Sequence, residues 1–142
     1  MPVSGVCTLD AIGLALAEAG AAGARLALLD ARRGEVFAAL YGPDGARLWE
    51  PLVCPPDDLA ERVAALPAPP AAAGSGAVRF RHELDRHGVQ IADDADPVHR
   101  VAARHICALA AAGAGEGRLD PIYLRPPDAE RWRERDSFQK AE

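Results

Sequence analysis

The stretch Leu28-Leu29-Asp30-Ala31-Arg32-Arg33-Gly34-Glu35-Val36-Phe37-Ala38-Ala39-Leu40-Tyr41 holds a short charged segment between two apolar runs. This pattern predicts a β-hairpin, with strands over residues 25–30 and 35–41 and a tight polar turn between them. The second strand carries apolar residues on both faces: Val36, Ala38 and Leu40 on one, Phe37, Ala39 and Tyr41 on the other. A strand that is apolar on both faces belongs in the interior of a sheet, so we expect it to be a central strand.

The residues after the hairpin predict a third strand and a helix. Gly42-Pro43-Asp44-Gly45 is a strong turn signal, because proline presets one dihedral angle and glycine permits positive φ. Residues 47–53 should form a third antiparallel strand, and Pro51 favours the edge of the sheet because it cannot donate a ladder hydrogen bond. A helix should begin at Pro55-Pro56-Asp57-Asp58, with acids at its positive end. Its buried stripe would be Leu59, Val63 and Leu66.

Strands and helices then alternate along the chain. Residues 71–73 predict a short buried strand, residues 77–86 a helix, residues 89–92 a short strand, and Asp96-Pro97 the start of a last helix. Three antiparallel strands followed by alternating helices and strands predict an α/β domain with a mixed sheet. Residues 130–142 are dominated by charged side chains and predict a frayed helix or a disordered tail.

The N-terminal residues predict a short apolar strand and an amphipathic helix. Residues 3–6 are the apolar start, Thr8 suits an N-cap, and Asp10 lies in the favourable first turn. Leu9, Ile12 and Leu16 then recur at helical spacing until the chain reaches the glycine at position 20. The helix therefore has one apolar stripe that needs a partner.

The composition fits one domain without a membrane or nucleic-acid signature. A chain of 142 residues with 49% hydrophobic residues can build a single core, although only 5% are aromatic, so stability should be modest. The net charge of -5, with acids and bases mixed, disfavours direct nucleic-acid binding, which normally shows a basic stripe. No apolar stretch approaches the roughly 20 residues of a membrane span, and there is no signal-peptide pattern, so a cytoplasmic location is the default expectation.

Three stretches together resemble the bacterial TsaB (YeaZ) family. They are Gly5-Val6-Cys7-Thr8-Leu9-Asp10-Ala11, the hairpin, and Pro121-Ile122-Tyr123-Leu124-Arg125-Pro126-Pro127-Asp128-Ala129. Proteins of that family are actin-like and Hsp70-like in fold and help make the threonylcarbamoyladenosine modification of transfer RNA. The resemblance implies that the mixed sheet is the ribonuclease-H-like half that is duplicated in actin-like proteins.

A full member of that family resembles two similar lobes, and the patterns of its first lobe do not occur here. Neither an Ile-Asp-Thr-Ser-type strand nor a Gly-Pro-Gly-Ser-Phe-Thr-Gly-type loop is present. The resemblance therefore implies a leading strand and interdomain helix over residues 1–24, a C-terminal actin-like lobe over 25–129, and the charged tail. Whether a first lobe was lost in nature or left out stays open. Without that lobe, we expect Leu9, Ile12 and Leu16 to be partly uncovered and the chain to self-associate, most simply as a twofold dimer.

The turn from Asp30 to Glu35 is a candidate contact site. It occupies the place where actin-like ATPases put a second phosphate-gripping turn, but Arg32 and Arg33 stand where such turns carry glycines. Arginines can hold a carboxylate or phosphate bidentately, yet they replace the exposed backbone N–H groups that cradle phosphate. The turn is open to three interpretations: a solvated hairpin tip with an Asp30 or Glu35 salt bridge, a contact to a protein or RNA complex, or a phosphate site.

The segment Gly74-Ser75-Gly76-Ala77 is a second candidate. It follows a predicted strand and precedes a predicted helix, where actin-like ATPases place an adenosine-contacting glycine loop. Glycines allow close approach of a ring, and a helix start offers free N–H groups. An ordinary tight strand-to-helix turn has the same sequence, so Gly74, Ser75, Gly76 and Ala77 are either a nucleotide-loop remnant or a structural turn.

No catalytic or metal-binding constellation is recognisable, and the sequence indicates no cofactor. Cys7, Cys54 and Cys107 form no Cys-x-x-Cys pair and are expected to be small reduced core residues. His105 lies on an apolar helix face and is expected to be a satisfied core histidine, whereas His99 lies six residues away on a different face. The catalytic relatives of the resembling family carry a metal-binding histidine pair that is absent here. No Gly-x-Ser-x-Gly elbow occurs.

Two functions from different classes fit these observations. The favoured one is a non-catalytic partner subunit in threonylcarbamoyl transfer to the adenosine next to the anticodon, which the resemblance associates with a TsaD-like catalytic homologue and a TsaE-like ATPase. The alternative is an enzyme, either an actin-like nucleotide-dependent transferase or a glycoprotease-like hydrolase. The absent histidine pair and the altered phosphate turn disfavour the enzyme. Because partner binding in the family runs mainly through the first lobe, this chain should bind a TsaD-like protein weakly.

Overall fold

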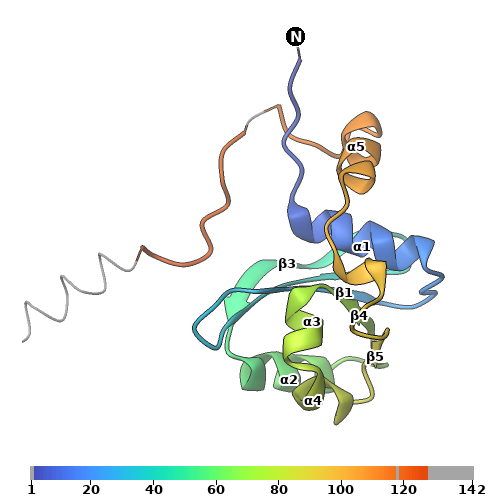
Figure 1. Cartoon of the computed structure of the whole chain (residues 1–142), viewed down its shortest axis with the longest axis vertical. Coiled ribbons are helices and arrows are strands. Elements are labelled where there is room, and N and C mark those ends of the chain that lie inside the picture. Colours follow the sequence, from blue (N-terminus) through green and yellow to red (C-terminus); the bar gives the residue numbers. More distant parts are fainter. Residues whose placement is uncertain (1, 118, 128–142) are drawn as a thin grey trace, which may run out of the picture.

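The computed structural model describes residues 2–117 and 119–127, which form one mixed sheet with helices on both faces (Figure 1). The five strands are ordered β3-β2-β1-β4-β5. β1 pairs antiparallel with β2 and parallel with β4, β2 pairs antiparallel with β3, and β4 pairs parallel with β5. The strands are β1 (Arg25–Asp30), β2 (Val36–Tyr41), β3 (Arg47–Cys54), β4 (Ala71–Ala73) and β5 (Gln90–Ile91). The predicted α/β class, the mixed sheet and the three leading antiparallel strands are confirmed, with β2 inside the sheet and β3 at its edge.

Helices cover the two faces of the sheet in two groups (Figure 1). One group packs α2, α3 and α4 against the larger core cluster, and the other packs α1 with η1 and α5 on the opposite face. None of the helices among the described residues is long and apolar enough to cross a membrane. The helices are α1 (Thr8–Glu18), α2 (Pro56–Ala64), α3 (Ser75–Arg79), α4 (Arg81–Asp85), the 3₁₀ helix η1 (Pro97–His99) and α5 (Ala103–Ala111).

The alternation of the hairpin residues decides which face each side chain covers. On the α2 face, Leu26, Leu28 and the even-numbered residues of β2 form the core with Leu59 and Leu84. On the α1 face, the strands present the smaller residues Ala27 and Ala39, together with Tyr41. Because alanines leave room, the helix on that face can approach the sheet closely.

Helix α1 buries its apolar stripe against its own sheet. Leu9, Ile12 and Leu16 are all buried, and they pack on the alanine face of β1 and β2. The approach is close: a Cβ added at Gly13 would lie 2.9 Å from the Tyr41 ring. The expectation that this stripe is uncovered is therefore wrong, because the small side chains on the sheet let the helix fold onto the lobe. The expected self-association can no longer rest on these three residues.

Three predictions about helices differ from the structure. The predicted helix over 77–86 is two short helices that are broken at Phe80, where φ is -106° and ψ is 26°. Asp96 accepts a hydrogen bond from Val98 N and caps only η1, after which Arg100 is extended and α5 begins at Ala103. Helix α1 has Cys7 at its N-cap and no side-chain cap, so Thr8 is its first residue rather than its cap.

The remaining differences lie near the chain ends and among the cysteines. The predicted leading strand over 3–6 is reduced to a single bridge between Gly5 and Glu116. Cys54 is buried as expected, but Cys7 is only half-buried and Cys107 is exposed on α5. The predicted charged tail over 130–142 lies outside the described residues.

Candidate functional site

The β1–β2 turn is closed by backbone hydrogen bonds and holds two arginines in a left-handed conformation. Ala31 N donates to Glu35 O, and Glu35 N donates to Arg32 O, both at 3.1 Å. The φ angles of Arg32, Arg33 and Gly34 are 63°, 57° and 75°. In the turn closed by the Glu35 N to Arg32 O hydrogen bond, the central residues are Arg33 and Gly34. Positive φ at both central residues is typical of a type I′ turn, in which asparagine and glycine are the favoured residues. An arginine in this region is uncommon and costs about 1–2 kcal/mol.

Two ion pairs hold the turn from opposite sides. Asp30 accepts a hydrogen bond from Arg32 N at 2.9 Å and pairs with the Arg79 guanidinium at 3.6 Å. Glu35 pairs with Arg125 at 2.6 Å, and Arg125 also donates to Ala31 O at 3.1 Å. The expected salt bridges of Asp30 and Glu35 therefore exist, but their partners come from α3 and the C-terminal segment.

The glycine loop packs tightly against strand β1. Gly74 has a φ of 110° and a ψ of 171°, and an added Cβ would lie 1.9 Å from the Leu28 carbonyl oxygen. An added Cβ at Gly76 would lie 2.7 Å from a methyl group of Val36. Ala77 is fully buried in the core. These glycines are needed for close packing of the helix on the sheet, as in a tight strand-to-helix turn.

The fold brings the two predicted candidate segments together. Asp30 N donates a hydrogen bond of 3.0 Å to Ser75 Oγ, so the end of β1 is joined directly to the start of α3. The chain order had placed these segments more than forty residues apart, and the parallel pairing of β1 with β4 makes them neighbours. The turn and the glycine loop thus form one structural unit at the C-terminal ends of the neighbouring strands β1 and β4.

His99 is a buried structural part of this unit that the sequence pattern did not indicate. It is buried, its Nδ1 accepts a hydrogen bond from Gly74 N at 3.2 Å, and its Nε2 lies 3.2 Å from Ala92 O. Because Nδ1 is an acceptor, we assign the ring proton to Nε2, which donates to Ala92. The Gly74 N–H group is therefore already used inside the protein.

A second histidine, His105, joins α5 to α1. Its buried ring places Nε2 2.7 Å from Glu18 Oε2, while Nδ1 is buried without a hydrogen-bond partner among the described residues. The hydrogen bond from His105 is the main cause that lowers the pKa of Glu18 below its usual value. His105 is buried as predicted, but only one of its two nitrogens is satisfied within the described part of the chain.

A polar network at the start of α1 was also missed. Asp10 accepts hydrogen bonds from Tyr41 Oη at 2.5 Å and from two Arg47 nitrogens at 3.0 and 2.6 Å. Burial, followed by the hydrogen bond to Asp10, raises the pKa of Tyr41 well above its usual range, so Tyr41 stays a donor. The sequence carried no signal for this network, because its members come from α1, β2 and β3.

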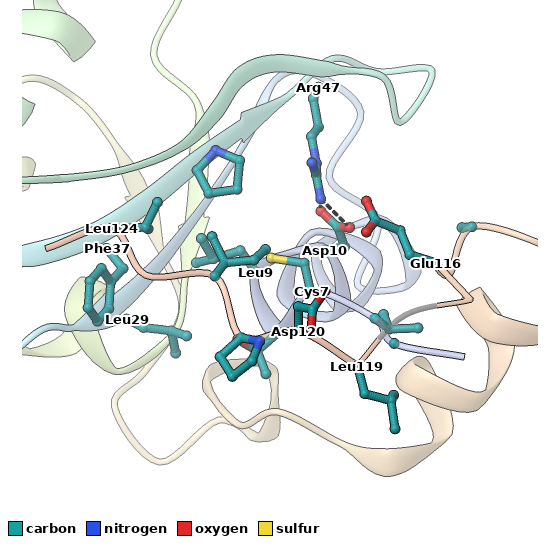
Figure 2. A pocket seen from close by; sticks show the side chains of 17 residues that line it. Cys7, Leu9, Asp10, Leu29, Phe37, Arg47, Glu116, Leu119, Asp120 and Leu124 are labelled. Carbon is teal, nitrogen blue, oxygen red and sulfur yellow. Dashed lines mark hydrogen bonds and ion pairs between the residues drawn. The ribbon is translucent and has the colours of Figure 1, made fainter. Parts of the chain in front are cut away.

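A groove of about 460 Å³ runs between the N-terminal end of α1, the sheet and the C-terminal segment (Figure 2). We call it the α1 groove. Figure 2 shows Leu29, Phe37 and Leu124 together at one end, and Asp10, Arg47 and Glu116 toward the other. Its size lies within the range of small-ligand and side-chain binding sites. Between its ends the lining is mostly apolar.

At the turn and the glycine loop, several groups that could contact a ligand are already engaged within the protein. At the turn, the carboxylates of Asp30 and Glu35 are engaged by arginines, and at the loop the Gly74 N–H is engaged by His99. Within residues 2–117 and 119–127, no group of three or more His, Cys, Asp or Glu side chains could hold a metal ion. The exposed side chains of the turn include those of Arg32 and Arg33. A guanidinium group can bind a carboxylate or a phosphate.

Comparison with solved structures finds proteins of the same fold. One is an uncharacterized protein from Pseudomonas aeruginosa with similarity to peptidase YeaZ, which is 28% identical, with a TM-score of 0.59. Another is YeaZ from Pseudomonas aeruginosa, which is 27% identical, with a TM-score of 0.58. Each match covers 87% of this chain, and the chain spans 59% of the length of each of these proteins. No family model and no curated protein matches the sequence.

The strand order, the mixed pairing and the helices on both faces, together with these matches, define an actin-like α/β lobe. Within that class the chain is a YeaZ-like protein, because two such structures match it over most of its length. The resemblance seen in the sequence to the TsaB (YeaZ) family is thereby confirmed.

Proposed function

We propose that this chain is a non-catalytic partner subunit in the cytoplasmic modification of transfer RNA to threonylcarbamoyladenosine. The similarity to YeaZ supports the family on which this role rests. In such a complex a TsaD-like catalytic homologue and a TsaE-like ATPase carry out the chemistry, and this chain contributes contacts. We expect no direct grip on nucleic acid by this chain, because its net charge is -5.

The non-catalytic role is supported mainly by the way the glycine loop is bonded and packed within the protein. A nucleotide-gripping loop presents free backbone N–H groups with room above them. Here the Gly74 N–H bonds His99, and the Cα of Gly74 lies so close to β1 that no side chain fits between them. The loop is thus a remnant of the nucleotide loop that now serves packing. The adjoining turn, with arginines in place of glycines, serves protein contact.

The alternative is an enzyme, and one of the matched structures is described as similar to a peptidase. Titration with ATP and with zinc or iron separates the two functions. Micromolar, stoichiometric binding of any of these would favour the nucleotide-dependent transferase or the glycoprotease-like hydrolase. We expect no such binding.

The direct test is reconstitution. The chain alone, mixed with threonylcarbamoyl-adenylate and transfer RNA, should transfer nothing, whereas addition of the chain to TsaD-like and TsaE-like proteins should raise their turnover. Turnover by the purified chain alone that a single substitution in it abolishes would show that the chain is an enzyme. No effect of the chain on the other two proteins would contradict the partner role.

A further inference from the structure

A second, smaller pocket lies between α1, α5 and the β2–β3 turn, and its volume is about 190 Å³. Gly13, Leu14 and Ala17 line it from one face of α1, because residues three and four apart share a helix face, and Leu109 lines it from α5. Helix α5 lies beside α1 on this side of the sheet (Figure 1). An apolar cavity of about 150 Å³ can hold a benzene ring, so this pocket, which we call the Arg25 pocket, has room for a ring or a short chain.

Three charged side chains among the described residues line the Arg25 pocket: Asp10, Arg47 and Arg25. The Asp10 carboxylate accepts hydrogen bonds from Arg47 Nε and Nη2 at 3.0 and 2.6 Å, so these two charges offset each other. Arg25 instead donates to two backbone carbonyls, from Nε to Ala21 O and from Nη2 to Pro43 O, both at 3.1 Å. Within the described part of the chain it pairs with no carboxylate, so the pocket carries an unbalanced positive charge.

The positive charge and the Asp10 carboxylate lie at opposite ends of the Arg25 pocket. Asp10 and Ala17 are two turns apart on α1, which is about 10 Å along the helix axis. The Arg25 guanidinium bonds the Ala21 carbonyl, beyond the Ala17 end of the helix. Because salt screens charges over about 8 Å at physiological ionic strength, an anion at Arg25 is only weakly repelled by Asp10. Glu50 also pairs with Arg47 but does not line the pocket.

The Arg25 side chain is held in place and still has donors to offer. Its two bonds to carbonyls fix the guanidinium between the loop after α1 and the β2–β3 turn. Its Nη1 group makes no hydrogen bond within the described residues. A guanidinium presents its N–H donors as a planar fork that matches the two oxygens of a carboxylate, and a fork that is already positioned loses less entropy on binding.

We propose that the Arg25 pocket binds a small carboxylic acid with a short apolar body. The carboxylate lies on the Arg25 guanidinium, and the body lies along Gly13, Leu14 and Leu109. Both parts of the ligand are selected by the pocket: an inorganic anion leaves the apolar walls unused, and an amine is repelled by the guanidinium. The inference does not depend on a role in transfer RNA modification, and either can fail alone.

A ligand series that keeps one shape and changes the charge tests the chemistry, with the full chain followed by amide NMR. Benzoate should bind in the millimolar range, as expected for so small a ligand, and should shift the amide signals of Gly13 and Gly45, which line the pocket. Gly88, in the turn after α4 and outside the lining, should not shift. Benzamide, benzylamine and inorganic phosphate should each bind at least about tenfold more weakly. Equal binding of benzamide or phosphate overturns the proposal.

Two variants then test the location. Arg25→Gln should weaken benzoate binding about tenfold or more, whereas Arg62→Gln, which removes an exposed arginine from α2 outside the pocket, should leave it unchanged. Because Arg25 also ties two loops, circular dichroism checks the fold. Ala17→Leu keeps Arg25 and fills the pocket from a half-buried helix position that tolerates leucine, so it should also remove binding. Binding that survives Ala17→Leu, or that survives Arg25→Gln in a folded chain, overturns the proposal, as does an unaltered chain without saturable benzoate binding.

Discussion

Replacing Gly74 with alanine should destabilise the protein strongly, because this glycine is required by both conformation and space. Its φ of 110° with a ψ of 171° is a region that is essentially restricted to glycine, and another residue there costs about 1–3 kcal/mol. The new Cβ would also lie 1.9 Å from the Leu28 carbonyl oxygen, which is backbone and cannot rotate away. The overpacking adds about 1–3 kcal/mol, so the expected loss is roughly 2–6 kcal/mol.

Thermal and urea unfolding followed by circular dichroism measure this loss. At about 3 °C per kcal/mol for a chain of this size, Gly74→Ala should lower the Tm by roughly 6–18 °C. Gly113→Ala is the matched control, because Gly113 also has positive φ, of 76°, but a Cβ there meets nothing within 4 Å. That variant should lose only about 1–2 kcal/mol. Equal Tm values for the two variants would refute the conclusion that the glycine loop is held by close packing on β1.

Two substitutions and one thiol-modification experiment test other parts of the structure. Arg33→Asn places an Asn-Gly pair in the type I′ turn and should stabilise the protein by about 0.5–1 kcal/mol in urea unfolding; a loss would show that the arginine itself holds the turn. The pKa of Glu18 is lowered in the folded state, first by the His105 hydrogen bond, so its contribution is present above its ordinary value of 4.5 and is lost as pH falls below it. Glu18→Gln should therefore flatten the acid limb of the stability profile, and an unchanged acid limb would contradict this. Burial raises the pKa of the Cys54 thiol, so a thiol reagent should modify exposed Cys107 well before Cys54 in the folded protein; equal rates would mean that Cys54 is accessible.

The hairpin shows how much of the fold could be predicted from local sequence. The apolar alternation of residues 25–41, interrupted by one charged turn, predicts two strands, and the structure has them at Arg25–Asp30 and Val36–Tyr41. Pro51 correctly places β3 at an edge. These features are local, because strand alternation and proline chemistry act over a few residues. The turn and the glycine loop were likewise located as separate segments, and the resemblance to actin-like ATPases made them candidate sites.

Helix boundaries and exposure were decided by tertiary contacts. The pattern of residues 96–111 reads as one helix, yet the burial of His99, with both ring nitrogens hydrogen bonded, accompanies an extended segment between η1 and α5. Likewise, the apolar stripe of α1 has the same sequence whether another lobe or its own sheet covers it. The helix packs on its own sheet because the alanines of β1 and β2 leave room for it to approach the sheet closely.

Local sequence patterns were enough to predict the α/β class and the order of the elements, because both depend on periodicity and on the conformational needs of glycine and proline. The hydrogen bond between Asp30 and Ser75 and the ion pair between Arg125 and Glu35 could be known only from the folded chain. These contacts join residues that are 45 and 90 positions apart in the chain. Partners at such separations are set by strand order and packing, and no local pattern records them.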